Sequence, residues 1–319
     1  MLEILSITTP VFLLIACGYA VVRVNLVPQA AIPGMGTFVV YLALPALLFN
    51  ALSGRPVAEV YNSSYLLAFA VGSMAALLIS VFIACKMRGV ALQRAAFIGL
   101  GSSLSNNGFI GYALVTQLFG TLGVAAAALS MLVDLVLLIP VTLILAEWAL
   151  DGRAQIQDAL FTAFKKTLRN PLVLAIGLGF LASAMQWQPP EPVQHTLAML
   201  ASSAAPLSLF VIGGMLVGIS VSGQKTDIGH MVGLKLILHP LLVALMVWWL
   251  PAFEPVLQLS AVLLAAVPMA GVFPLIAQAY GQQQICAAAL VSATLLSFLS
   301  LNGVLLLMDH LGLLTVLSG

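Results

Sequence analysis

Charged residues are scarce in this chain. Only 7% of its 319 residues are Asp, Glu, Lys or Arg, whereas 62% are hydrophobic. A soluble domain carries about 25% charged residues, so this chain has too little charge to cover a surface that faces water. Its net charge of +1 leaves no strong field to attract nucleic acid. The composition therefore indicates a protein whose solvent is the lipid bilayer, and we expect no nucleic-acid partner.

Cysteine is also rare, and the common cofactor motifs are missing. The three cysteines, Cys17, Cys85 and Cys286, lie in separate hydrophobic segments without metal-type spacing. The sequence contains no Walker loop and no dinucleotide-binding fingerprint. We therefore expect neither a metal ion nor a cofactor. The first hydrophobic segment follows Glu3 rather than a basic stretch, so it does not predict a cleavable signal peptide.

Long hydrophobic runs, in contrast, are abundant. A membrane-spanning helix needs about 20 apolar residues, and ten segments approach or exceed that length. The runs are continuous rather than alternating, which excludes a β-barrel. The sequence predicts an all-α polytopic membrane protein with ten transmembrane helices. The predicted spans are 4–22, 34–53, 63–85, 95–119, 122–147, 170–187, 194–221, 230–250, 256–279 and 282–308.

The basic residues are distributed asymmetrically between the predicted loops. Ten of the 11 fall on one side of the ten-span arrangement, and only Arg55 falls on the other. Basic loops face the cytoplasm. The asymmetry therefore predicts a multi-pass protein of the cytoplasmic (inner) membrane with both termini outside.

The two halves of the chain repeat each other at a constant offset of 161 residues. The segment "ALVTQLFG" corresponds to "PLIAQAYG", and "LPALLF" corresponds to "APLSLF". Prolines, glycines and a glutamine recur at this offset, including Pro10 and Pro171, Pro45 and Pro206, Gln117 and Gln278, and Gly120 and Gly281. Residues 1–150 and 170–319 thus form two five-helix repeats joined by a cytoplasmic linker, 151–169. Because five is odd, the second repeat is inverted, which is typical of transporters.

The fourth and ninth predicted spans are interrupted at equivalent places. One contains "SNNG" and the other "PMAGVFP"; proline, glycine and asparagine all disfavour a continuous helix. Paired interruptions in inverted repeats mark a substrate site near the bilayer midplane. The alternative is a polar kink that serves helix packing. The predicted substrate-binding residues are Ser105, Asn106, Asn107, Gly108, Pro268, Met269 and Gly271.

Asp134, Lys235 and His239 are ionisable residues inside predicted spans. Asp134 is near the middle of span five, and Lys235 and His239 share one face of span eight. A carboxylate at that depth costs about 2.5–3.5 kcal/mol, so it needs a compensating role. Asp134 is a candidate proton carrier or cation ligand, with Lys235 and His239 as candidate partners in coupling. An interior ion pair or hydrogen bond between spans five and eight is the structural alternative.

The segments "LALPALLFNAL", "SNNGFIGYAL" and "VPMAGVFPLIAQAYG" resemble those of the auxin efflux carrier family over essentially the whole chain. The resemblance implies the bile acid symporter-like fold, with crossed broken helices four and nine in a domain that moves against a scaffold. It places the family's carboxylate-contacting asparagine at Asn106 or Asn107. Ala113 stands where the family often has proline. The chain also lacks the long central loop of the plant carriers, which favours a bacterial member.

The sequence therefore favours a secondary active transporter of small organic anions, with malonate as the family-based favourite. Coupling to H⁺, coupling to Na⁺ and uniport all stay open, as does assembly into a homodimer. An intramembrane protease is the main rival from another class, but neither a Gly-x-Ser-Gly motif nor a second intramembrane aspartate accompanies Asp134. A channel or receptor would not require paired interruptions. We therefore do not expect an enzyme.

Overall fold

The computed structural model describes residues 2–151, 165, 168–218 and 225–313, and within these ranges the chain forms helices and no strand. The predicted linker 151–169 lies largely outside the described residues, as do the last three residues of the predicted span 194–221. Because the bilayer core offers no water to backbone groups, helices satisfy the hydrogen bonds of these segments internally.

The N-terminal half of the chain contains the helices of the first predicted repeat. They are α1 (Leu2–Arg23), α2 (Ile32–Phe38), α3 (Leu44–Ser53), α4 (Val57–Val60), α5 (Ser63–Phe82), α6 (Leu92–Ser103), α7 (Tyr112–Val133) and α8 (Ile139–Asp151). The C-terminal half contains α10 (Pro171–Ala184), α11 (Glu191–Met215), α12 (Lys225–Gly233), α13 (His239–Trp249), α14 (Pro255–Ala266), α15 (Phe273–Gln278) and α16 (Gln283–His310).

Short turns of other helix types connect several of these elements. One is a 3₁₀ turn, η1 (Gln29–Ala31). The others are five-residue π-helical turns: η2 (Val39–Ala43), η3 (Ile83–Met87), η4 (Asn107–Gly111), η5 (Asp134–Leu138) and η7 (Leu234–Leu238). Single π-helical turns often accompany functional sites. Here η4, η5 and η7 carry Asn107, Asp134 and Lys235.

Six stretches within the described residues are long and apolar enough to cross a membrane: Gln29–Ser53, Ser63–Met87, Leu92–Leu150, Glu191–Met215, Lys225–Trp249 and Gln283–His310. The stretches Thr8–Arg23, Pro171–Ala184 and Pro255–Ala266 are apolar but shorter. Leu92–Leu150 has 59 residues, far more than one crossing needs. The chain leaves the helix within it at Leu104–Asn106 and kinks at Gly120, whose φ is 58°.

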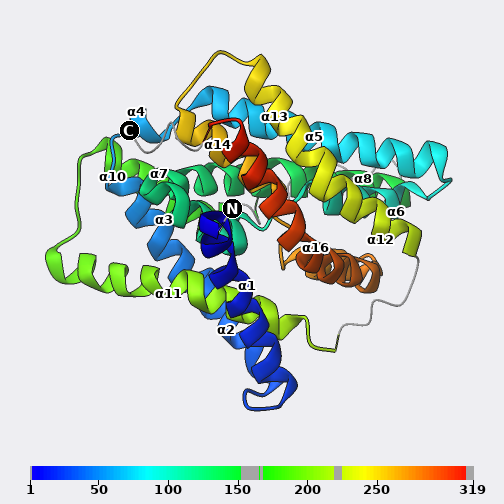
Figure 1. Cartoon of the computed structure of the whole chain (residues 1–319), viewed down its shortest axis with the longest axis horizontal. Coiled ribbons are helices and arrows are strands. Elements are labelled where there is room, and N and C mark those ends of the chain that lie inside the picture. Colours follow the sequence, from blue (N-terminus) through cyan, green and yellow to red (C-terminus); the bar gives the residue numbers. More distant parts are fainter. Residues whose placement is uncertain (1, 152–164, 166–167, 219–224, 314–319) are drawn as a thin grey trace.

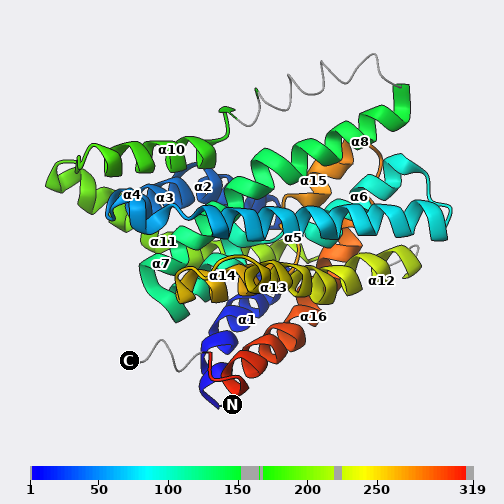
Figure 2. The same cartoon turned by 90° about the horizontal axis from the view of Figure 1, so that it is seen from above.

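The helices form two groups (Figures 1 and 2). In the first, α1 packs against α11, and α3 packs against both α10 and α11. In the second, α5 packs against α6 and α13, α6 against α8, α7 against α14, and α12 against α16. We call these the α1–α11 group and the α5–α13 group. In Figure 2, α10, α3 and α11 lie toward one end of the molecule, and α6, α8 and α12 lie toward the other.

Small residues allow α1 and α11 to approach backbone to backbone. A Cβ atom placed on Gly18 would lie 2.1 Å from the carbonyl oxygen of Phe210, and one on Gly213 would lie 1.9 Å from that of Ile15. Only glycine fits at such distances. Close packing through small residues is how helices associate in lipid, where apolar burial provides no driving force.

Polar side chains connect the two groups. Thr8 Oγ1 in α1 donates to Asn302 Oδ1 in α16 over 2.9 Å. After α3, Arg55 donates to Thr121 Oγ1 in α7, from Nε over 3.0 Å and from Nη2 over 2.6 Å. These bonds hold the α1–α11 group against the α5–α13 group in the conformation described.

Helix boundaries in the two halves correspond at the offset of 161 residues. The stretch Ser63–Met87 has its counterpart in Lys225–Trp249, within one residue at each end. Gly120 has its counterpart in Gly281, and both adopt a positive φ, 58° and 69°. The end of α6 at Ser103 corresponds within two residues to the end of α14 at Ala266.

Candidate functional site

Both interrupted helices end where the sequence turns to asparagine, proline and glycine. After α6 ends at Ser103, Leu104 is extended and Asn106 is non-helical before η4 resumes at Asn107. After α14 ends at Ala266, Val267 is extended, and α15 begins only at Phe273. We call residues 104–106 the first break and 267–272 the second break.

The two breaks contact each other directly. The backbone N–H of Asn106 donates to the carbonyl oxygen of Pro268 over 2.8 Å. A buried backbone donor freed from its helix needs such a partner. The first break therefore supplies the donor and the second break supplies the acceptor of a hydrogen bond that joins them.

A buried carboxylate lies next to the first break. Asp134 is 4% exposed, and its Oδ2 accepts a hydrogen bond from Asn107 Nδ2 over 2.7 Å. Three buried polar atoms here have no hydrogen-bond partner among the residues that the structure describes: Asp134 Oδ1, Asn107 Oδ1 and Asn106 Nδ2. Unpaired buried groups cost about 1–3 kcal/mol each, so this concentration suits a site that a polar ligand or water completes.

A buried lysine joins the first break to the C-terminal end of α14. Lys235 is fully buried, and its Nζ lies 2.8 Å from Ser105 Oγ in the first break and 2.8 Å from the Ala265 carbonyl oxygen in α14. It is also 2.8 Å from His239 Nδ1, while His239 Nε2 is 2.8 Å from Ser73 Oγ. Lys235 and Asp134 interact electrostatically, but no ion pair within 4.0 Å joins these two described residues.

A small cavity of about 160 Å³ lies at the first break. Its polar lining comes from Ser105, Asn106, Asp134 and Asn170, and Gly271 lines it from the second break. Apolar side chains, among them Leu44, Phe109 and Met131, form much of the remaining wall. Drug-sized ligands occupy pockets of about 300–1,000 Å³, so this cavity suits a much smaller molecule.

The structure places the predicted site residues in three positions. Ser105, Asn106, Gly108, Gly271 and Asp134 line the cavity. Asn107 reaches it through its bond to Asp134, Pro268 contributes a backbone carbonyl, and Lys235 and His239 lie behind Ser105. Met269 is fully buried in an apolar cluster with residues such as Phe97 and Phe273, and it is not among the residues that line the cavity.

Asn170 lines the cavity although the sequence analysis did not select it. Its side chain caps α10 by accepting a hydrogen bond from the backbone N–H of Leu172 over 2.9 Å. Asparagine before proline is a recognised start signal for a helix, so the sequence indicated the cap. Nothing local in the sequence indicated that this cap also lies beside the first break.

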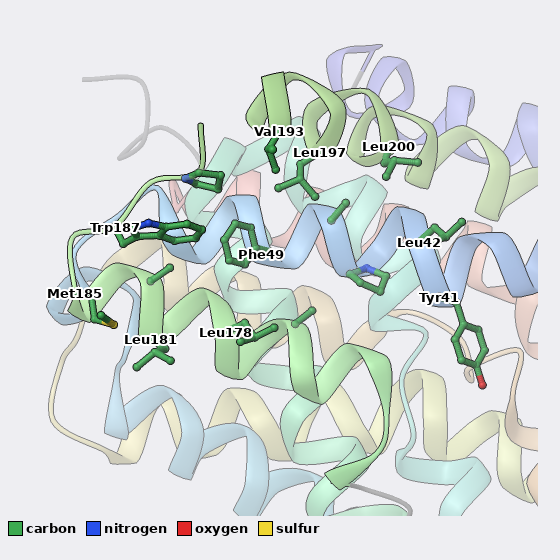
Figure 3. Close-up of a pocket in the computed structure, with 15 residues that line it drawn as sticks. Tyr41, Leu42, Phe49, Leu178, Leu181, Met185, Trp187, Val193, Leu197 and Leu200 are labelled. Atoms are coloured by element: carbon green, nitrogen blue, oxygen red, sulfur yellow. The ribbon is translucent and has the colours of Figure 1, made fainter. Parts of the chain in front are cut away.

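A larger groove in the α1–α11 group has a different character (Figure 3). It has a volume of about 650 Å³ and is lined almost entirely by apolar side chains from α3, α10 and α11 and the segments that flank them, including Phe49, Leu178 and Leu197. No charged residue lines it. A small anion would lose its hydration there without gaining a hydrogen bond, so the smaller cavity is the candidate site.

Comparison with known proteins identifies a family for this chain. A family model described as "Membrane transport protein" matches residues 4–305. The chain belongs to this family. A protein from Rhizobium meliloti (strain 1021) named "Putative malonate transporter" is 31% identical over 311 residues, covering 96% of each chain. The resemblance to auxin efflux carriers is thereby confirmed, and the chain is a multi-pass membrane transporter.

The transporter's cavity combines groups of both charges within a few side chains. Asp134 supplies a carboxylate, Lys235 supplies an ammonium behind Ser105, and the asparagines supply amide donors and acceptors. When both ionisable groups are charged, the pair is neutral. When Asp134 takes up a proton, the charge of Lys235 is unmatched and the cavity favours an anion.

Proposed function

We propose that this transporter carries small carboxylates across the membrane, with malonate as the favoured substrate. The observation that supports this is the cavity at the first break, where Asn106 Nδ2 and the Oδ1 atoms of Asn107 and Asp134 are buried without partners. An amide N–H and a protonated carboxyl group are donors to a substrate carboxylate. The relative named for malonate transport supports the choice of substrate.

We propose alternating access by an elevator-type movement of the α5–α13 group against the α1–α11 group. Inverted repeats allow alternating access by movement of one group of helices against another, and the sequence predicts two such repeats. The correspondence of helix boundaries at 161 residues and the positive φ of both Gly120 and Gly281 support it. The bonds Thr8–Asn302 and Arg55–Thr121 would break during the movement, because each connects the two groups.

We propose coupling to protons through Asp134. Two carboxylates in one low-dielectric cavity repel each other, and one shared proton removes the repulsion. A substrate carboxylate would therefore bind together with a proton on Asp134, whose Oδ1 has no other hydrogen-bond partner. Sodium symport and uniport by the same fold are the alternatives, and uptake driven by a sodium gradient alone would favour the first.

The proposed orientation places both termini outside and the predicted basic loops in the cytoplasm of a bacterial cell. Single cysteines in a cysteine-free background test it. A cysteine within 151–169 is expected to be shielded from an impermeant thiol reagent in intact cells, whereas one at Gly319 is expected to react. The reverse labelling would contradict the orientation.

A thermal-shift screen of carboxylates on the purified transporter tests the substrate. A ligand at 100 times its dissociation constant stabilises its target by about 2.7 kcal/mol. Malonate is expected to raise the unfolding temperature more than acetate or the longer succinate. Uptake of labelled malonate into liposomes, with saturation and counterflow, then distinguishes a carrier from a channel. A screen in which no small carboxylate shifts unfolding would contradict the proposal.

A further inference from the structure

The side chain of Lys235 occupies an unusual position, because it lies at the junction of both interrupted helices. It is fully buried in η7, the π-helical turn that precedes α13. An ammonium group has three N–H donors and no acceptor. Each of the three finds one partner at 2.8 Å: Ser105 Oγ, the Ala265 carbonyl oxygen and His239 Nδ1.

Two of these partners are oxygens of the kind that bind small cations in transporters. Ala265 lies in the last turn of α14, so its carbonyl belongs to the negative end of that helix. Ser105 lies in the first break, and the carboxylate of Asp134 interacts with Lys235 electrostatically. Unwound backbone and the C-terminal ends of half-helices coordinate Na⁺ in other transporters.

The surroundings hold the ammonium at this point rather than leaving it free to move. His239 Nδ1 faces Lys235, and its Nε2 is held by Ser73 Oγ in α5. The imidazole also makes an edge contact with Phe69, with ring centroids 5.9 Å apart. Lys235 is therefore fixed by Ser105, by Ala265 and by His239, and His239 is itself held by Ser73 in α5.

We propose that the Lys235 ammonium occupies a monovalent-cation site formed by the first break and the C-terminal end of α14, and that this site accepts Na⁺ when the lysine side chain is removed. The charge of the lysine then takes the place of a bound Na⁺ in the native protein, and proton coupling through Asp134 does not depend on this site. The consequence for transport rests on the proposed function, but the cation site itself does not, because ion binding can be measured without a substrate.

The test is thermal unfolding of Lys235→Ala in sodium, potassium and choline chloride at equal ionic strength. Sodium is expected to raise the unfolding temperature of this variant saturably, by roughly 2–4 °C or more over choline. The parent protein is expected to show no saturable difference between the salts. Lys225→Ala is the matched control, since Lys225 is exposed at the start of α12 and lies in the same helical stretch.

A second variant, Lys235→Met, retains the apolar volume of the lysine stem but not its charge, and the same response to sodium is expected. Identical unfolding of both variants in all three salts would overturn the proposal, as would their failure to fold in every salt. A saturable sodium response of the parent protein would also overturn it. If malonate binding fails while sodium stabilises Lys235→Ala, the cation site stands and the substrate proposal falls.

Discussion

The two breaks have nearly the same place in the repeat but very different chemistry. The first break and the residue that follows it present Ser105, Asn106 and Asn107, each at most 3% exposed. The second break, 267–272, contains no polar side chain and contributes the backbone carbonyl of Pro268. The two interruptions therefore differ in what they offer: the first presents polar side chains, and the second accepts a hydrogen bond from the first through the backbone carbonyl of Pro268.

This division leads to an expectation for mutations. Changes at the first break and at its partner Asp134 should alter coupling and affinity, because the side chains themselves face the cavity. Changes at Pro268 and Met269 in the second break should alter stability or nothing, because the side chains of these two residues do not line the cavity and a carbonyl group survives any side-chain substitution. The predictions below test that contrast in order of expected effect.

The largest effect is expected for Asp134→Asn. The amide cannot exchange a proton but can still bond to Asn107, so accumulation driven by a pH gradient should be abolished while substrate exchange persists. Uptake and counterflow are measured side by side in liposomes. Full pH-driven accumulation by this variant would remove Asp134 from the coupling mechanism. A variant of lower stability whose surviving activity is still coupled would assign Asp134 a structural role.

Asn107→Ala and Asn106→Ala are expected to weaken malonate binding by about 5–150-fold, because each removes a buried polar contact worth about 1–3 kcal/mol. Asn107→Ala should have the larger effect, since it also releases Asp134 Oδ2. Titration calorimetry on the folded variants measures the change. Parent-like affinity in both variants would show that the site lies elsewhere.

Met269→Ala in the second break is expected to lower the free energy of unfolding by about 2–5 kcal/mol, because Met269 is fully buried among apolar side chains. The dissociation constant of the folded variant for malonate should be unchanged. Met185→Ala is the matched control, since Met185 is 67% exposed. A variant with native stability and weakened binding would instead return Met269 to the substrate site.

The smallest effect is expected for Pro268→Ala. The carbonyl that accepts from Asn106 remains after the substitution, and so the dissociation constant for malonate should stay within about threefold of the parent value. Calorimetry against Asn107→Ala makes the comparison within one experiment. A loss as large as that of Asn107→Ala would mean that the proline ring itself shapes the site.

Helix ends were readable from the sequence because their causes are local. Asparagine, glycine and proline disfavour a helix wherever they occur, so the stretches that contain Asn106 and Pro268 could be selected without a structure. The bond between the Lys235 ammonium and Ser105 joins residues 130 positions apart. Such a contact depends on how α13, α14 and the first break pack, which no local pattern records.

The side-chain directions within the second break were also beyond the sequence. Pro268 and Met269 are neighbours, yet one supplies a backbone carbonyl to the crossing and the other is buried in an apolar cluster. In non-helical backbone there is no regular period from which to assign a face.

The glycine contacts between α1 and α11 have a consequence for how this protein responds to its bilayer. With Gly18 and Gly213 set against the backbone of the facing helix, no acyl chain can enter the seam at these points. Thicker, thinner or more fluid membranes can therefore tilt α1 and α11 together but cannot part them there. Lipid composition should act on this protein by reorienting the pair as one body.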